Sequence, residues 1–261
     1  MTIAEVFPRP TVKQVVFQIR YPNLFFIEEK IGEYQVRIME QFPESSLQLR
    51  RNLLIADIGE GAKVEDLVGG EESLAVKKIW RFASPDGVSL NVHSDSLDIS
   101  STVHKTYNNP AATPRFRDAI EFAVARFLEV VAVPKFLRIG LRYIDECPLP
   151  SELSTSSFRE WYNSALPVER FAVEEVLECE VVARVRRESE CRLTFRERLD
   201  TRGEKITYSL DFDGYAEGVP SSEYLRTTDT LHGLVADEFE RTIKEPVIKH
   251  MRQRPEEDSD A

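Results

Sequence analysis

The residues best suited to chemistry in this chain are arginines in its second half. They recur at alternate positions of two expected strands. Arg184 and Arg186 share one face of an expected strand, and Arg192, Arg196 and Arg198 share one face of the next. Guanidinium groups bind carboxylates and phosphates through paired hydrogen bonds. The pattern therefore predicts a surface that binds an acidic peptide, a phosphate backbone or a ligand carboxylate.

Three further arginines join this face if the central strands align with it. The full set of candidate binding residues is Arg20, Arg138, Arg142, Arg184, Arg186, Arg192, Arg196 and Arg198. The alternative is a solvated face on which the arginines form cross-strand pairs with acids. Those acids would be Glu178, Glu180, Glu188, Glu190 and Asp211. The sequence leaves both interpretations open.

A second candidate polar site consists of Asp211, Asp213 and His232. The two carboxylates are two residues apart on a strand, so they share a face and could hold a cation or transfer protons. No third or fourth oxygen ligand is readable nearby, and pairing with the arginines is the alternative. His232 borders the apolar stripe of the last helix, where a core histidine is the alternative. We assign no catalytic or metal-binding residue and expect no cofactor.

Two short motifs resemble functional signatures but lack the required context. Gly59-Glu60-Gly61 is not followed by the Lys-Ser/Thr pair of a phosphate-binding loop, so we expect an acidic loop over residues 59–72. His93-Ser94-Asp95 contains the residue types of a catalytic triad. Adjacent strand positions point to opposite faces, so these side chains cannot form a relay.

The elements that must position these residues follow one order twice. Residues 17–21 (FQIRY) and 139–143 (IGLRY) are near copies, and each begins a series of strand, helix, antiparallel meander and long helix. This order predicts an α+β fold with one curved, mainly antiparallel sheet, helices on one face and pseudo-two-fold symmetry, as in saddle-like or helix-grip folds. Two ferredoxin-like modules are the alternative. The halves would span 1–133 and 134–254 of one domain, followed by a disordered acidic tail, 255–261.

Local signals set the expected boundaries of several elements. Asn23 is predicted to cap a first helix, and Thr113, followed by proline, to cap a second. A turn is predicted at residues 84–87 (SPDG). Further strands are expected near residues 47–57, 173–186, 191–199 and 205–212. A short helix is expected at 158–165, and a long last helix is expected to begin at Ser221 or Ser222 and to be bent or interrupted at Pro246.

Composition narrows the classes of partner. The 261 residues carry 34 basic and 45 acidic side chains, for a net charge of −11, which argues against wholesale binding of nucleic acid. The three cysteines show no metal-ligand spacing, which suggests a reducing compartment. We find neither a signal peptide nor an apolar run long enough to span a bilayer, and therefore expect a cytoplasmic protein without a membrane partner.

Several stretches together resemble a known family. They are residues 15–22 (VVFQIRYP), 80–82 (WRF) before Asp86-Gly87, 138–145 (RIGLRYID), and 210–213 (LDFD) ahead of Leu231-His232. They are similar to a sporadically distributed bacterial protein family of unknown function and about this size, over nearly the whole chain. The resemblance implies no established activity. Its patchy distribution is associated with mobile or defence loci.

The function that we expect is therefore non-enzymatic. We expect a protein-binding, regulatory or accessory subunit of a bacterial system, which docks a protein partner on the open arginine-rich sheet face or at a sheet edge. Nucleic-acid binding or RNA processing is one alternative. An uncharacterised hydrolase that uses Asp211, Asp213 or His232 is another. Whether the sheet edges pair in a homodimer stays open.

Overall fold

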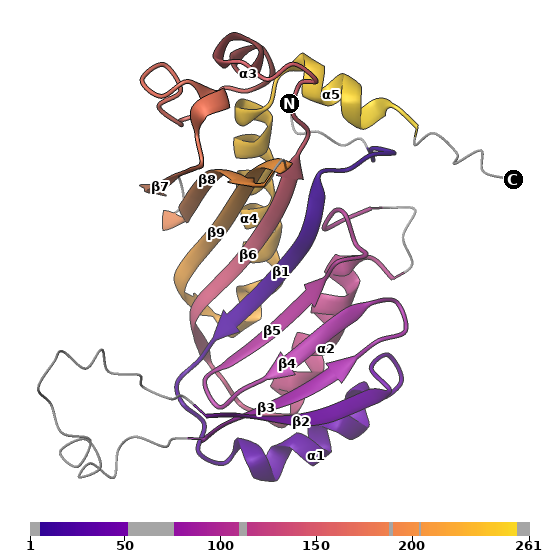
Figure 1. The fold of residues 1–261 in the computed structure, drawn as a ribbon. Coiled ribbons are helices and arrows are strands. Elements are labelled where there is room, and N and C mark those ends of the chain that lie inside the picture. Colours follow the sequence, from indigo (N-terminus) through magenta and orange to yellow (C-terminus); the bar gives the residue numbers. More distant parts are fainter. Residues whose placement is uncertain (1–5, 52–75, 110–113, 188–189, 204, 255–261) are drawn as a thin grey trace, which may run out of the picture.

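One antiparallel sheet of nine strands organises the part of the chain that the computed structural model describes, which is residues 6–51, 76–109, 114–187, 190–203 and 205–254 (Figure 1). Across the sheet the strands follow the order β2-β3-β4-β5-β1-β6-β9-β8-β7. The prediction of an α+β fold with an antiparallel sheet is confirmed. The strands are β1 (Val12–Arg20), β2 (Glu44–Arg51), β3 (Val76–Ala83), β4 (Val88–Val92), β5 (Ser96–Ser101), β6 (Lys135–Cys147), β7 (Glu178–Arg186), β8 (Arg192–Arg202) and β9 (Lys205–Pro220).

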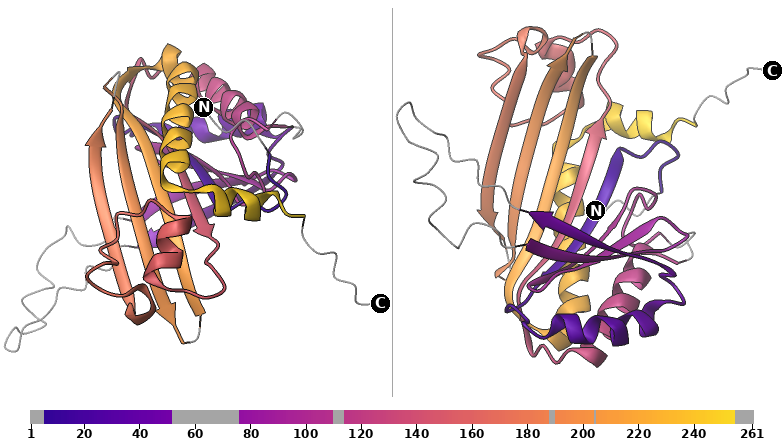
Figure 2. Two further views of the ribbon diagram at one scale, coloured as in Figure 1. Left: turned by 90° about the horizontal axis from the view of Figure 1, so that it is seen from above. Right: turned by 60° about the horizontal axis from the view of Figure 1, so that its bottom comes forward.

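Five α-helices accompany the sheet within the described residues. They are α1 (Ile27–Ile38), α2 (Phe116–Val130), α3 (Thr155–Trp161), α4 (Tyr224–Thr242) and α5 (Glu245–Arg252), with short 3₁₀ turns η2 (Val173–Glu175) and η4 (Ser221–Glu223). Helices α2 and α4 lie against one face of the sheet, and the opposite face is open (Figures 1 and 2). No described helix is both long and apolar enough to cross a lipid bilayer.

The central contact of the sheet joins the two near-copy motifs. Strands β1 and β6 are antiparallel neighbours, and their register places Phe17 opposite Leu141 and Ile19 opposite Ile139. All four side chains are fully buried on the helix side. Because side chains alternate along a strand, the polar partners of the same motifs necessarily face the open side.

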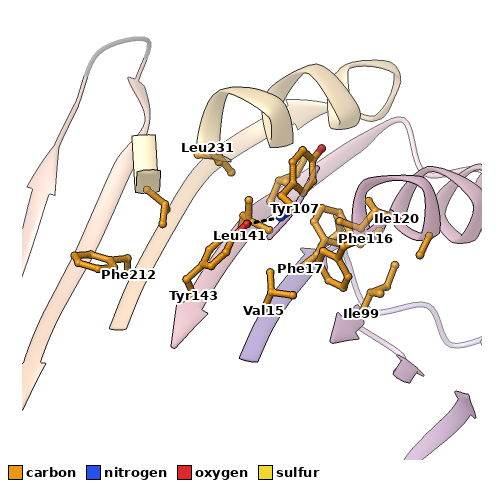
Figure 3. Packing of buried hydrophobic residues seen from close by; sticks show 14 of the residues in the cluster. Val15, Phe17, Ile99, Tyr107, Phe116, Ile120, Leu141, Tyr143, Phe212 and Leu231 are labelled. Atoms are coloured by element: carbon orange, nitrogen blue, oxygen red, sulfur yellow. Dashed lines mark hydrogen bonds between the residues drawn. The ribbon is translucent and has the colours of Figure 1, made fainter. Parts of the chain in front are cut away.

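Helix α2 closes the core over the N-terminal half. Its apolar positions recur with helical spacing, and Phe116, Ile120 and Phe127 are fully buried. Figure 3 shows Phe116 and Ile120 in this packing. Tyr34 of α1 meets Phe127 edge to face, with ring centroids 5.6 Å apart, and donates its hydroxyl proton to the Ala123 carbonyl. Helix α1 therefore packs on α2 at one end of the molecule.

The first helix begins later than predicted. The backbone N–H groups of Tyr21 and Leu24 donate to the carbonyls of Asp95 and Ser94, which ties this segment to the turn between β4 and β5. Helix α1 consequently starts at Ile27, without a side-chain cap. The prediction that Asn23 caps the helix was wrong because a tertiary hydrogen-bond pattern took precedence over a local capping signal.

The second helix has a different cap from the one predicted. Helix α2 begins at Phe116, and the Asp118 carboxylate accepts hydrogen bonds from the backbone N–H and the guanidinium of Arg115. The expected cap, Thr113, lies outside the described residues. The expected loop 59–72, the end of the strand expected at 47–57 and the acidic tail lie outside them too.

Boundaries in the second half shift for similar tertiary reasons. Residues expected to begin a strand at 173 form the 3₁₀ turn η2, and α3 occupies Thr155–Trp161 instead of 158–165. Strand β9 extends eight residues beyond the predicted end at Phe212, because β6 pairs with it as far as Pro220. The long last helix is interrupted as predicted, with α4 ending at Thr242 and α5 starting just before Pro246.

The turn predicted at residues 84–87 is present. The Ser84 N–H donates to the Val88 carbonyl, and the Gly87 N–H donates to the Ser84 carbonyl. Gly87 has a φ of 74°, and a Cβ atom there would lie 2.6 Å from Cγ2 of Val103. Only glycine satisfies both the positive φ and the close approach.

We expect Phe17→Ala to lower the free energy of unfolding by about 3–5 kcal/mol, because it leaves a cavity beneath the central strands. The matched control is Val36→Ala on α1, whose side chain is 70% exposed. Urea unfolding followed by circular dichroism measures both. Equal unfolding midpoints for the two variants would show that β1 does not carry the core.

Candidate functional site

Five of the eight candidate arginines lie on the open sheet face in ion pairs with carboxylates. Each pair has a nitrogen–oxygen distance between 2.5 and 3.1 Å. The pairs are Arg138–Asp213, Arg142–Asp211, Arg192–Glu217, Arg196–Asp211, Arg196–Glu180 and Arg198–Glu178. The structure thus brings these five together, but with their charges already compensated by neighbouring strands.

Arg138 is the most constrained of these residues. Its guanidinium donates to both oxygens of Asp213, at 2.7 and 2.6 Å, and lies 4.7 Å from the ring centroid of Tyr215. A Cβ atom on Gly140 would come within 2.3 Å of its Nη1 atom. The glycine in the second motif copy therefore lets the arginine lie flat on the sheet. Such a held guanidinium is a structural cation.

Asp211 forms ion pairs with two arginines at once. It accepts from Arg142 at 2.6 Å and from Arg196 at 2.8 Å, and its side chain is only 13% exposed. The hydrogen bonds that Arg142 donates to Asp211 raise the pKa of Arg142. Burial raises the pKa of Asp213, although Arg138 opposes this shift. Both carboxylates are thus paired with arginines. This pairing is the alternative that the sequence offered to a cation or proton-transfer site.

The other three candidate arginines stand apart. Arg184 and Arg186 lie on the edge strand β7, and Arg20 lies at the end of β1 opposite Arg138. None of the three forms an ion pair with any residue that the structure describes. They are too dispersed to form one anion site. Glu188, a partner expected from the sequence, lies outside the described residues.

His232 is separated from Asp211 and Asp213 by the sheet. It belongs to α4 on the helix side, where its ring centroid lies 5.0 Å from that of Tyr107 and 6.2 Å from that of Tyr143. Burial lowers its pKa. The structure therefore does not assemble the predicted polar site. Over the described ranges, no group of three or more His, Cys, Asp and Glu side chains could hold a metal ion.

The N-terminal half of the open face contains a polar hollow of about 470 Å³. Gln14 of β1 and Gln48 of β2 both line it, although three strands lie between them, so the sheet curls around it. Asp98 accepts from Gln18 at 2.7 Å and contacts His93 at 3.1 Å. Other lining side chains make no hydrogen bond to a described residue: Arg81, Ser89, Asn91 and Ser100. This half therefore retains hydrogen-bonding groups that no described residue uses.

Strand β2 borders this hollow and forms one edge of the sheet. Leu47 and Leu49 are 55% and 60% exposed, and they point to the helix side, since Leu47 lies opposite Trp80. Gln48 points to the hollow. Further exposed apolar side chains lie on α1 and on the residues that flank it: Phe25, Val36 and Met39. Leu47 and Leu49 already alternate with polar residues in the sequence, but nothing local marks β2 as an edge.

Comparison with known proteins adds no identity to this picture. No family model matches the chain, and no curated protein or solved structure is significantly similar to it. The family resemblance described above stays an expectation, and function must be argued from the geometry.

We expect Asp211→Asn to lower the free energy of unfolding by about 1–3 kcal/mol, because two arginines lose a charged acceptor. In 1 M salt, where the screening length is about 3 Å, the loss should shrink. Chemical denaturation at both ionic strengths measures it, with Glu40→Gln in the exposed turn after α1 as the control. A loss no larger than that of the control would show that the pairs are not structural.

Proposed function

We propose that this protein is a non-enzymatic protein-binding module, which docks an extended segment of a partner protein along strand β2. The observation that carries the proposal is the state of this edge. Every described side chain of β2 is exposed, and the strand pairs with β3 through eight consecutive residues without a bulge. A regular sheet edge is a template for another strand, and proteins usually protect such edges.

The two faces of β2 define the chemistry of the partner. On the helix side, an added strand would contact Leu47 and Leu49, which favours apolar side chains there. On the open side it would border Ser46 and Gln48 of β2. Beyond them, on β3, Lys77 and Arg81 are exposed and form no ion pair with a described residue. This arrangement favours an extended partner segment in which apolar and acidic residues alternate.

The other candidate surfaces support docking less well. Most cations of the arginine-rich face are already paired, so a partner would have to displace Asp211, Asp213 or Glu217. That exchange gains little free energy, because each new ion pair replaces an existing one. The opposite edge strand, β7, presents charged side chains on its open side. These charges disfavour the addition of another strand. Charge compensation also weakens the nucleic-acid alternative.

The finer features expected from the sequence belong to the same proposal. The sheet order places β1 and β6 side by side at the junction of the halves, which supports the proposed pseudo-two-fold, saddle-like arrangement within one domain. A cytoplasmic accessory role in a bacterial regulatory or defence system is proposed from the family resemblance alone.

The test is a purification from the source cells with wild type, Leu47→Lys/Leu49→Lys and two controls. The lysines leave the exposed strand folded but obstruct docking on its apolar side. We expect a stoichiometric protein that the wild type retains and that the lysine variant loses at least tenfold, as quantified by mass spectrometry.

The controls place the charge changes elsewhere. Val182→Lys alters the opposite edge, where the side chain is 46% exposed, and Arg192→Glu/Arg196→Glu alters the arginine-rich face. Both should keep the partner. Loss of the partner only in the arginine variant would move the docking site to that face. Retained nucleic acid would overturn docking of a separate protein at this edge. A homodimer that dissociates when the β2 lysines are introduced would overturn it too.

A further inference from the structure

A cavity of about 110 Å³ lies on the helix side of the sheet, remote from β2. The N-terminal arm, β1, the segment 105–106, β6, β9, α4 and α5 line it. Most of its lining is apolar: Phe7, Val12, Phe212, Val235, Phe239 and Met251. The carboxyl of Asp145, which is only 2% exposed, lies among these groups, and Lys105, Tyr143 and His232 also line the cavity.

The arm that lines this cavity is held at Arg9 and at Thr11. The Arg9 N–H donates to the Met251 carbonyl at 3.0 Å, and the Glu146 N–H donates to the Thr11 carbonyl at 3.0 Å. The Thr11 hydroxyl also donates to Oδ1 of Asp145 at 2.7 Å. The fold therefore preforms the cavity and orients the carboxyl within it, which limits the entropy lost when a ligand binds.

Asp145 has no cationic partner among the described residues. Its Oδ2 atom accepts no hydrogen bond from them. Another buried acid, Glu197, accepts from the Ser164 hydroxyl and the Ala165 N–H at Oε2 and so fixes a loop. Its Oε1 atom also has no hydrogen-bond partner among the described residues, but Glu197 does not line this cavity. Burial raises the pKa of Asp145 to about 7. A buried carboxyl without a cation costs stability when it ionises, unless a ligand supplies the charge.

We propose that this cavity is a binding site for a small aliphatic primary amine, whose ammonium group pairs with Asp145 and whose alkyl chain fills the apolar part. An apolar cavity of about 150 Å³ accommodates benzene. The smaller volume here suits roughly four to six heavy atoms, as in butylamine. The site rests on different residues from the β2 edge and does not depend on partner docking.

The ionisable groups around Asp145 leave room for a cation. From α4, His232 is kept neutral by burial, which lowers its pKa. From β6, burial raises the pKa of Tyr143, which stays protonated. The Lys105 ammonium donates to the Thr102 carbonyl at 2.6 Å instead of to the carboxyl. Across the sheet, Asp211 adds negative charge.

Groups behind the cavity wall complete this environment. Arg9 of the arm acts on His250 of α5, whose pKa is lowered by its burial and by this arginine. Neither residue lines the cavity. The local field therefore favours a cationic ligand over a carboxylate and, once Asp145 is ionised, over a neutral alcohol.

Titration calorimetry with butylamine, 1-butanol and butyrate at pH 8 tests the proposal on the full chain. We expect butylamine to bind at least tenfold more tightly than the other two. Protons compete with the ammonium for Asp145, so affinity should fall by up to tenfold for each pH unit below about 7. This wild-type titration needs no variant.

Two variants separate the carboxyl from the cavity. Asp145→Asn keeps the shape and should lower butylamine affinity at least tenfold, while Ala236→Leu fills the space with the carboxyl intact and should abolish binding. Thermal unfolding of each variant without ligand verifies its fold. Equal affinity for butylamine and butanol, unchanged affinity in Asp145→Asn, or no binding by the wild type would overturn the proposal.

Discussion

The antiparallel pairing of β1 with β6 is the constraint on which the rest of the structure depends. Its register places Phe17 against Leu141 on the helix side and Gln18 against Gly140 on the open side. A slip of one residue would exchange the faces of a whole strand and expose its buried row. Because each strand also pairs with a further strand of its own half, this register is transmitted in both directions across the sheet.

The halves of the open face, although continuous, differ in how far their polar groups are satisfied. Between β6 and β7, carboxylates of neighbouring strands neutralise most of the arginines, so that half forms a rigid, charge-compensated surface. Between β2 and β1, the curled sheet leaves amide, hydroxyl and guanidinium groups around a hollow. Binding at the N-terminal half can use polar groups that no described ion pair occupies. Binding at the arginine-rich half must first break ion pairs. This difference is why we place partner docking at the N-terminal end.

Two acids, Asp145 of β6 and Glu197 of β8, lie on the buried face of their strands. Asp145 is in phase with Ile139, Leu141 and Tyr143, so the pleat that buries those residues buries its carboxyl too. The alternation in the sequence carries this signal. What the sequence does not carry is the cavity, because its walls come from the N-terminal arm and from α4 and α5, at opposite ends of the chain.

The class of fold, the alternation of faces in the central strands, the turn at Gly87 and the apolar face of α2 were all predictable from local sequence patterns. Each of these depends on residues within a few positions of one another. Three other features became visible only in the folded chain: β2 is an edge, β9 continues to Pro220, and Asp211 pairs with Arg142 and Arg196 rather than with His232. These features depend on pairing between strands far apart in the chain, and local periodicity is the same whichever strand becomes the neighbour.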